Sequence, residues 1–190
     1  MKKPCLIKVG GSLYNYADFP KIFTKLITCM DCPVVVLGGG GDIVDSIRRL
    51  HQVHGLSEKV SHWMAIYALD LTGRILLKLL PDAVCWENPH RPPVDKKLTI
   101  LMPSKFCRMD AVRSPMECIP ETWDATSDSL SVRVATAWGF DTLILCKAAS
   151  VEPHLDWKGY HEAGLIDGLF EGFVSRVGAP SNVSIIKMLT

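Results

Sequence analysis

The sequence predicts an α/β domain in which a mainly parallel sheet is covered by helices on both faces. Short apolar, β-tending runs alternate with stretches of helical periodicity along most of the 190 residues. Two of the apolar runs end in glycine clusters, at Gly10-Gly11 and at Gly38 to Gly41. Strands that alternate with helices indicate βαβ units, and ligands of such sheets bind beyond the carboxyl ends of the strands. Both glycine clusters are expected at that edge.

The first half of the chain is expected to contain two strands and three helices. Asp18 is a candidate N-cap for the first helix, and Ser57 suits the start of the third. Gly73 is expected to break or bend that third helix. In chain order the elements are a strand from Cys5 to Val9, a helix from Phe19 to Thr28, a strand from Pro33 to Leu37, a helix that opens out of the four glycines with Ile43, Val44, Ile47 and Leu50 at helical spacing, and a helix from Ser57 to Leu80.

The second half is expected to contain four strands and one helix, with a proline-rich loop between the first two strands. Gly139 is expected to end the helix. The elements are strands from Ala83 to Trp86 and from Leu98 to Met102, a helix from Ser127 to Trp138, and strands from Thr142 to Cys146 and from Val183 to Met188. No internal repeat or low-complexity tract is visible in the sequence.

The composition excludes several classes of function. The chain has 21 basic and 20 acidic residues and a formal net charge of +1, so it lacks the basic excess of a nucleic-acid binder. Lys8 interrupts the first apolar run before it could form a signal sequence, and no apolar stretch is long enough to span a membrane. Seven cysteines, several in strand-like runs, are typical of a reduced protein. We expect a cytoplasmic protein that binds neither nucleic acid nor membranes.

Candidate metal ligands are few. Cys29 and Cys32 form the sole CxxC pair, without the second pair or the histidines that a zinc site needs, and they precede a strand. His51 and His54 lie three residues apart on a helix but lack a third ligand. We therefore predict that the protein itself holds no metal.

The glycine clusters indicate an anion site. Glycines between a strand and a helix let the backbone approach an anion and turn successive N–H groups towards it at the positive end of the helix. The cluster from Gly38 to Gly41 is not a P-loop, because Asp42 and Ile43 follow in place of Lys and Ser or Thr. It also lacks the third glycine of a dinucleotide fingerprint, which makes a nicotinamide-dependent oxidoreductase a weak alternative.

Lys8 places a cation at the same edge. It lies in an otherwise buried strand, two residues before the first glycine pair, and a buried charge needs a partner. Phosphoryl transfer requires positioning and cations directed at the developing oxygen charge, which a lysine supplies.

Three segments together resemble the amino acid kinase family. They are Lys8-Val9-Gly10-Gly11-Ser12, the strand and glycines at 34–41, and Asp124-Ala125-Thr126-Ser127-Asp128 before a helix and a strand. They occur in the order of that family and span about residues 5–150. The resemblance implies a three-layer α/β/α sandwich that transfers the γ-phosphoryl group of ATP, with Mg²⁺ held on the nucleotide.

The resemblance also implies roles for individual residues. Lys8 and Asp128 are the predicted catalytic pair, in which the aspartate holds the lysine, although Asp128 alone also fits a first-turn helix acid. Lys147 is a candidate second cation and equally fits a strand-end lysine in solvent. The predicted nucleotide- or phosphate-binding residues are Gly10, Gly11, Ser12 and Lys147, and the predicted substrate-binding residues are Gly38, Gly39, Gly40, Gly41, Asp124 and Ser127.

Further segments resemble one branch of the family, the aminomethylfuran phosphate kinases of methanofuran biosynthesis in one-carbon metabolism. They are Leu56-Ser57-Glu58, His62-Trp63-Met64-Ala65-Ile66, Trp123 to Ser129, and Gly164 to Phe170. His62 and Trp63 fit packing residues and also remain candidates for the substrate side. The implied reaction is phosphorylation of a furan phosphate ester, such as an aminomethylfuran phosphate, to a diphosphate.

The segment from Cys146 to Val151 departs from the family pattern. It lacks the glycine and the acidic residues that many members carry beside the adenine pocket. This departure supports the alternative function, a non-catalytic protein that binds or stores an oxyanion or phosphorylated metabolite. The resemblance further implies one domain over residues 1–190, with a substrate-side lobe at about 1–120, a shortened nucleotide-side lobe at about 121–190, and a homodimer or higher homo-oligomer.

Overall fold

The six predicted strands form one parallel sheet. The structure is a computed structural model and describes residues 3–93, 98–152 and 155–188. The strand order is β3-β4-β2-β1-β5-β6, and every neighbouring pair is parallel. Each predicted boundary is correct to within one residue. The bounds are β1 Cys5–Val9, β2 Val34–Gly38, β3 Val84–Trp86, β4 Leu98–Leu101, β5 Thr142–Lys147 and β6 Asn182–Lys187.

The four predicted helices are present, and the structure adds shorter ones that the sequence analysis missed. The predicted helices are α1 Phe19–Thr28, α2 Gly41–His54, α3 Glu58–Leu79 and α5 Ser127–Trp138. The additions are the 3₁₀ helix η1 Gly11–Asn15 and helices α4 Pro103–Arg113, α6 Trp157–Glu162 and α7 Phe170–Val174. Elements of five or six residues are too short to display a helical period, and α4 buries only three of its residues. Among the described residues, no helix is both long enough and apolar enough to cross a membrane.

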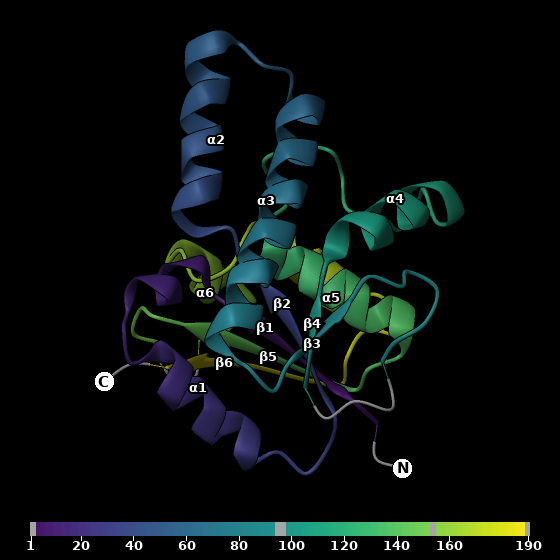
Figure 1. The fold of residues 1–190 in the computed structure, drawn as a ribbon. Coiled ribbons are helices and arrows are strands. Elements are labelled where there is room, and N and C mark those ends of the chain that lie inside the picture. The colour runs from purple at the N-terminus through teal and green to yellow at the C-terminus, as the bar shows by residue number, and fades with distance from the viewer. Residues whose placement is uncertain (1–2, 94–97, 153–154, 189–190) are drawn as a thin grey trace.

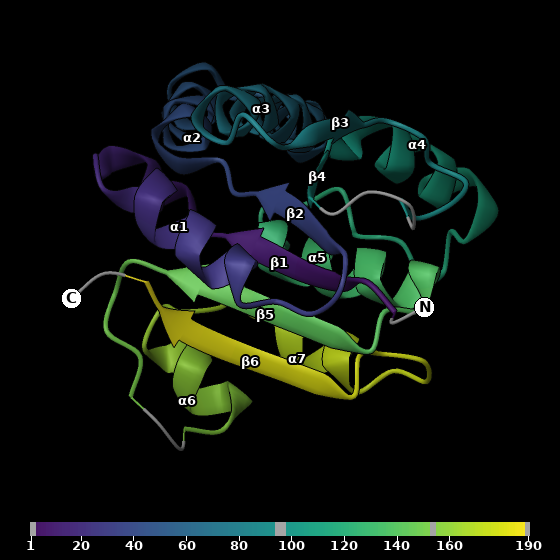
Figure 2. The same cartoon turned by 60° about the horizontal axis from the view of Figure 1, so that its bottom comes forward.

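Two separate cores lie on the two faces of the sheet, so the predicted three-layer sandwich is confirmed. In β1, Cys5, Ile7 and Val9 pack against α1, whereas Leu6 packs with α5 and α7 on the opposite face. Figure 2 shows α1 in front of the sheet and α5 and α7 behind it. Lys8 shares the face of Leu6, because side chains two residues apart in a strand point the same way.

Helix α3 packs on β2, β4 and β3 and is continuous from Glu58 to Leu79, so the predicted break at Gly73 is wrong. Ile66 and Leu69 in its first half join the core under α5, and Leu76 near its end joins the core under α1. Gly73 serves packing, because a Cβ atom there would lie 2.9 Å from the sulfur of Met102. The helix pair α2 and α3 projects away from the sheet at one end of the molecule (Figure 1).

Candidate functional site

The sheet register brings two lysines to the same place. Lys8 of β1 is paired with Leu145 of β5, and Lys147 lies two residues further along β5. Both lysine side chains therefore emerge on the sheet face that α5 covers, near the carboxyl ends of the strands. The first turn of α5 carries Asp128.

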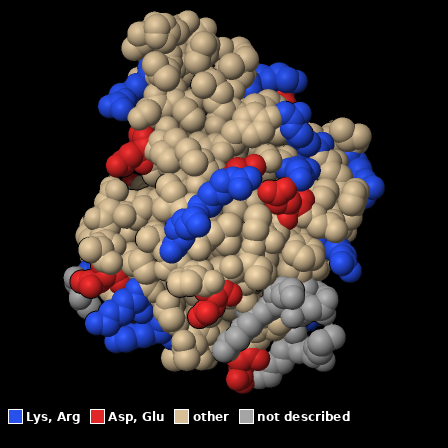
Figure 3. Space-filling view, in the orientation of Figure 1, with Lys and Arg blue, Asp and Glu red and all other residues tan. Residues whose placement is uncertain are grey.

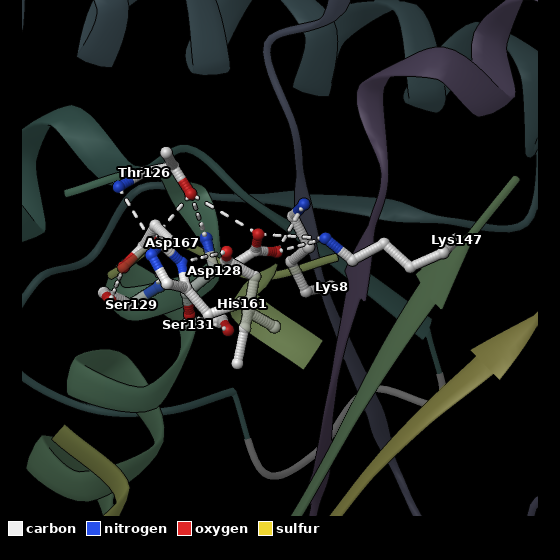
Figure 4. A network of polar contacts seen from close by, with 9 residues as sticks. Lys8, Thr126, Asp128, Ser129, Ser131, Lys147, His161 and Asp167 are labelled. Atoms are coloured by element: carbon white, nitrogen blue, oxygen red, sulfur yellow. Dashed lines mark hydrogen bonds and ion pairs between the residues drawn. The ribbon is translucent and has the colours of Figure 1, made fainter. Parts of the chain in front are cut away.

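Asp128 joins the two lysines in a buried triad. Its Oδ1 lies 2.7 Å from Nζ of Lys8, and both of its carboxylate oxygens lie 2.9 Å from Nζ of Lys147. The side chains of Lys8, Asp128 and Lys147 are 5%, 8% and 13% exposed. Figure 4 shows the two ammonium groups converging on the carboxylate from neighbouring strands. Lys8 and Asp128, which the family resemblance predicts as a pair, are therefore in contact, and Lys147 is buried in the same cluster.

The triad carries one surplus positive charge. Burial alone would raise the pKa of the Asp128 carboxyl, but the charges and hydrogen bonds of Lys8 and Lys147 hold this pKa below its ordinary value. Burial and the neighbouring charge of Lys8 lower the pKa of Lys147 from 10.5 to about 8. At neutral pH two ammonium groups therefore share one carboxylate, and an anion is the ligand that would balance the excess charge.

We expect this balance to make the activity of the protein sensitive to alkaline pH. As the pH rises through about 8, the free protein loses the charge of Lys147, and binding of a phosphorylated ligand should weaken. The kcat/KM should fall up to about tenfold per pH unit above this value. Lys147→Arg should move the decline to higher pH because arginine keeps its charge. The exposed Lys21→Arg on α1 is the control, and an unchanged profile in Lys147→Arg would contradict the assignment.

The lowered pKa of Lys147 should make the stability of the fold rise over the pH range in which activity falls. The folded protein holds the Lys147 proton less tightly than the unfolded chain, whose lysine titrates near 10.5. The burial of this charge therefore opposes folding at neutral pH, and the opposition is relieved as the pH rises from about 8 to 10.5.

The two glycine turns pack directly on each other. A Cβ atom on Gly11 would overlap the backbone of Gly41, and one on Gly39 would lie 2.8 Å from the amide nitrogen of Gly11. The Gly39 amide donates a 2.8 Å hydrogen bond to the carbonyl of Val9. Gly41 has a φ of +53°, a conformation that favours glycine. Close approach of the two turns is thus a steric reason for these glycines, in addition to any ligand.

A cavity of about 220 Å³ opens beside the triad, between the glycine turns, α2, α3 and the segment before α5. Seven of the predicted site residues line it: Lys8, Gly11, Ser12, Gly39, Gly40, Gly41 and Ser127. Asp128 contacts the lining residue Lys8, and Lys147 is joined to Lys8 through Asp128. The structure therefore gathers most of the predicted site around one space, while the roles of these residues stay predictions.

Three predicted residues belong neither to the lining of this cavity nor to the triad. Gly10 faces β5, where its amide donates a 2.8 Å hydrogen bond to the carbonyl of Cys146. Gly38 faces Tyr14 and Thr72, because a Cβ atom there would lie 2.7 Å from the Tyr14 hydroxyl. Asp124 is exposed and lies within 3.5 Å of the Thr122 hydroxyl.

The same cavity also has an aromatic wall and a cation, Trp123 and Arg48, which are not among the predicted site residues. The guanidinium of Arg48 lies 4.9 Å from the centre of the Trp123 ring. His62 is buried in the same wall, and burial lowers the pKa of its imidazole, so that the ring is mainly neutral at pH 7. His51 contacts the Trp123 ring and lies 3.0 Å from the Ser61 hydroxyl. These side chains come from α2, α3 and the segment before α5.

Two further polar residues near the triad were also missed. Asp167 accepts hydrogen bonds from the first turn of α5, which lies about 40 residues earlier in the chain. Lys187 ends β6 in register with Lys147, so its exposed side chain lies on the same face of the sheet. Asp167 lies within a segment quoted for the family resemblance, but only the fold reveals its partners. No local pattern distinguishes Lys187 from a solvated strand end.

The other candidate ligands from the sequence do not form a centre. All seven cysteines are free thiols, including Cys29 and Cys32. Within residues 3–93, 98–152 and 155–188, no group of three or more histidine, cysteine, aspartate or glutamate side chains is arranged to hold a metal ion.

Comparisons with known proteins place this architecture. The uridylate kinase of Archaeoglobus fulgidus matches with a TM-score of 0.59 at 18% identity, over 100% of this chain and 91% of that structure. The UMP kinase of Ureaplasma parvum matches with a TM-score of 0.60 at 13% identity, over 92% of this chain and 85% of that structure. The chain has the amino acid kinase fold. The fold class predicted from the sequence is therefore confirmed.

The chain is also similar in sequence to a curated protein. The [5-(aminomethyl)furan-3-yl]methyl phosphate kinase of Methanocaldococcus jannaschii is 26% identical over 132 residues, which are 68% of this chain and 58% of that protein. The predicted resemblance to the aminomethylfuran phosphate kinase branch is confirmed as a resemblance, although the match spans less than two thirds of the relative. No family model matches the sequence.

Proposed function

We propose that this protein is an ATP-dependent small-molecule kinase that transfers the γ-phosphoryl group to a phosphate monoester. The observation that carries the proposal is the buried triad of Lys8, Asp128 and Lys147, with its surplus positive charge beside a cavity lined by glycine turns. A site of this kind favours an anion whose negative charge develops on several oxygens, as in phosphoryl transfer. The kinase names of the relatives support the same proposal.

In the proposed reaction an oxygen of the acceptor phosphate attacks the γ-phosphorus of ATP. A new P–O bond forms, the bond to the β–γ bridging oxygen breaks, and ADP leaves with the electron pair. The ammonium groups of Lys8 and Lys147 would neutralise the charge on the transferred group, while Asp128 holds both in place. The carboxylate of Asp128 already accepts from both lysines. We therefore propose that Mg²⁺ is held by the nucleotide phosphates and by water.

For the acceptor we propose a small aromatic phosphate monoester, with an aminomethylfuran phosphate as the first compound to test. Trp123 supplies a flat apolar surface, and Arg48 supplies a cation for a second phosphate. The neutral imidazole of His62 can exchange a hydrogen bond with a polar substituent. The relative from Methanocaldococcus jannaschii is named for a substrate of this kind.

The test is a measurement of turnover with several candidate acceptors. The protein is mixed with ATP and Mg²⁺ and with [5-(aminomethyl)furan-3-yl]methyl phosphate, UMP or a simple alkyl phosphate, and diphosphate products are measured by mass spectrometry. We expect ADP and one diphosphate to form in equal amounts, with at least about 10³-fold slower product formation in Lys8→Met, whose buried lysine is removed. Absence of product with every acceptor would contradict the proposed acceptor class.

The alternative function is a non-catalytic binder of phosphorylated metabolites. It is supported by the segment from Lys147 to Val151, which lacks the glycine and the acidic residues that many members of the amino acid kinase family carry there. Calorimetry with magnesium-ATP separates the two proposals. Binding of phosphate esters without binding of millimolar nucleotide would favour the binder over the kinase.

The expected homodimer or higher oligomer stays a prediction, as does a cytoplasmic location. Helix α3 presents a partly exposed apolar stripe at a spacing of three or four residues, formed by Val60, Met64, Tyr67, Leu71, Ile75 and Leu79. Figure 3 shows that the upper part of this face is largely uncharged, with basic side chains at its margins. We propose that a second copy of the chain packs on this stripe.

A further inference from the structure

The carboxylate of Asp167 is the acceptor around which the start of α5 is organised. It accepts five hydrogen bonds, four of them from Thr126 and Ser129. The backbone amides of Thr126 and Ser129 donate to Oδ2 at 2.9 and 3.1 Å, and the hydroxyl of Thr126 donates at 2.8 Å. The hydroxyl of Ser129 donates to Oδ1, and the Leu169 amide donates at 3.0 Å. Figure 4 shows the contacts of Asp167 with Thr126 and Ser129 on the far side of Asp128 from the lysines.

These contacts leave Asp128 free to face the lysines. The first amides of a helix lack partners within the helix, and an aspartate in the first turn competes to accept from them. Here Thr126 accepts from the Asp128 amide at 3.1 Å, and Asp167 accepts from the Ser129 amide. A hydroxyl has one proton, and that of Thr126 lies nearer to Asp167, at 2.8 Å, than to Asp128, at 3.4 Å. The strong donors left to Asp128 are the two ammonium groups.

Asp167 is itself held firmly. It follows Leu165 and Ile166, which are 4% and 5% exposed, and precedes Phe170, which is fully buried in the core under α5. These residues belong to the connection from β5 to β6, and this connection begins after Lys147, the last residue of β5. The backbone around Asp167 is therefore anchored on both sides, and its carboxylate can serve as a fixed point for α5.

We propose that Asp167 is a positioning residue that sets Asp128 between Lys8 and Lys147. Its effect on turnover rests on the proposed kinase function, whereas its effect on the geometry of the triad does not. Asp167 lies behind α5 and acts through the first turn of that helix. A displacement of about 1 Å at a reacting centre can lower the rate by on the order of 10²-fold. We therefore expect loss of the hydrogen bonds of Asp167 to lower kcat.

The kinetic test uses Asp167→Asn, which keeps the size of the side chain and removes two of its acceptor sites. We expect kcat to fall by roughly 10- to 100-fold, with the KM of the acceptor changed by less than about threefold. Asp156→Asn is the matched control, because Asp156 is exposed and caps the short helix α6 through the Gly159 amide. An unchanged kcat in folded Asp167→Asn would overturn the proposal.

A double-mutant cycle with Asp128→Asn separates positioning from an independent role. If Asp167 acts through Asp128, the double variant should be no slower than Asp128→Asn alone. Losses that multiply would show that Asp167 contributes by a separate route and would overturn the proposal.

A titration of the free protein makes the test independent of kinase activity. Lysine carbons are labelled with ¹³C, and the Lys147 signal is assigned with Lys147→Arg. The groups that face Lys147 are Asp128 and Lys8. The titration midpoint should fall in Asp167→Asn, as in Asp128→Asn, and should stay unchanged in Asp156→Asn. A fall of the midpoint, together with no turnover of any tested acceptor by the native protein, would contradict the proposed acceptor class and keep the positioning role. An unchanged midpoint would overturn the positioning role.

Discussion

Lys8→Met is expected to lower kcat by about 10³-fold or more, which corresponds to roughly 4 kcal/mol of lost transition-state stabilisation. The Lys8 ammonium lines the cavity and lies 2.7 Å from Asp128, so it is placed to neutralise charge on a phosphoryl group. Methionine keeps the apolar stem of the side chain and removes the charge. Initial rates with saturating ATP and acceptor measure the effect.

The same variant should fold normally. Removal of Lys8 leaves Asp128 paired with Lys147 at 2.9 Å, so a buried cluster with a surplus charge becomes a neutral pair. The melting temperature should therefore be unchanged or higher. Lys21→Met, an exposed change on α1, should leave kcat and melting temperature near those of the native protein. Full activity in Lys8→Met would refute a catalytic role for this lysine.

Asp128→Asn is expected to damage both stability and activity. It leaves two buried ammonium groups without a counter-charge, and removal of one partner from a buried ion pair destabilises proteins by about 3–5 kcal/mol. The pKa of Lys147 should fall further, because the charge of Asp128 raises it in the native protein. The free energy of unfolding from urea titration at pH 6.5 measures the loss, and kcat is measured in the same samples.

The pH dependence identifies the cause of this destabilisation. Lys147 becomes neutral in both proteins as the pH rises above about 8, so the stability difference between Asp128→Asn and native protein should shrink by pH 9. Asp141→Asn is the contrast, because the Lys3–Asp141 pair is exposed and such pairs contribute little. An equal loss at pH 6.5 and pH 9 would mean that Lys147 is not part of the charge balance.

The fold was accessible from local patterns because every central strand is a short apolar run. In β1 and β2 all residues are buried, so the runs are continuous and easily recognised. Helices α6 and α7 were not predicted because their few residues fit the irregular connection between β5 and β6 equally well. The break expected at Gly73 was wrong because the contact with Met102, which only the folded chain provides, explains that glycine.

The candidate site was predicted unevenly, for reasons that differ between residues. Lys8 was conspicuous because a charge interrupts a buried strand. Lys147 lies at a strand end, where lysines are ordinarily solvated, and its burial depends on the pairing of β5 with β1. Arg48 and Trp123 come from separate segments and meet only when α2 packs beside the loop before α5.

The sequence by itself determined the α/β class, the strand positions, the two glycine turns and the prominence of Lys8, because periodicity, glycine content and a charge in an apolar run are local properties. Only the tertiary structure decided which charged and polar groups are in contact. It placed Lys147 and Lys8 on one carboxylate, packed Gly11 against Gly41, and joined Asp167 to α5 across about 40 residues. Those contacts depend on strand register and helix docking, which arise from packing of the whole chain.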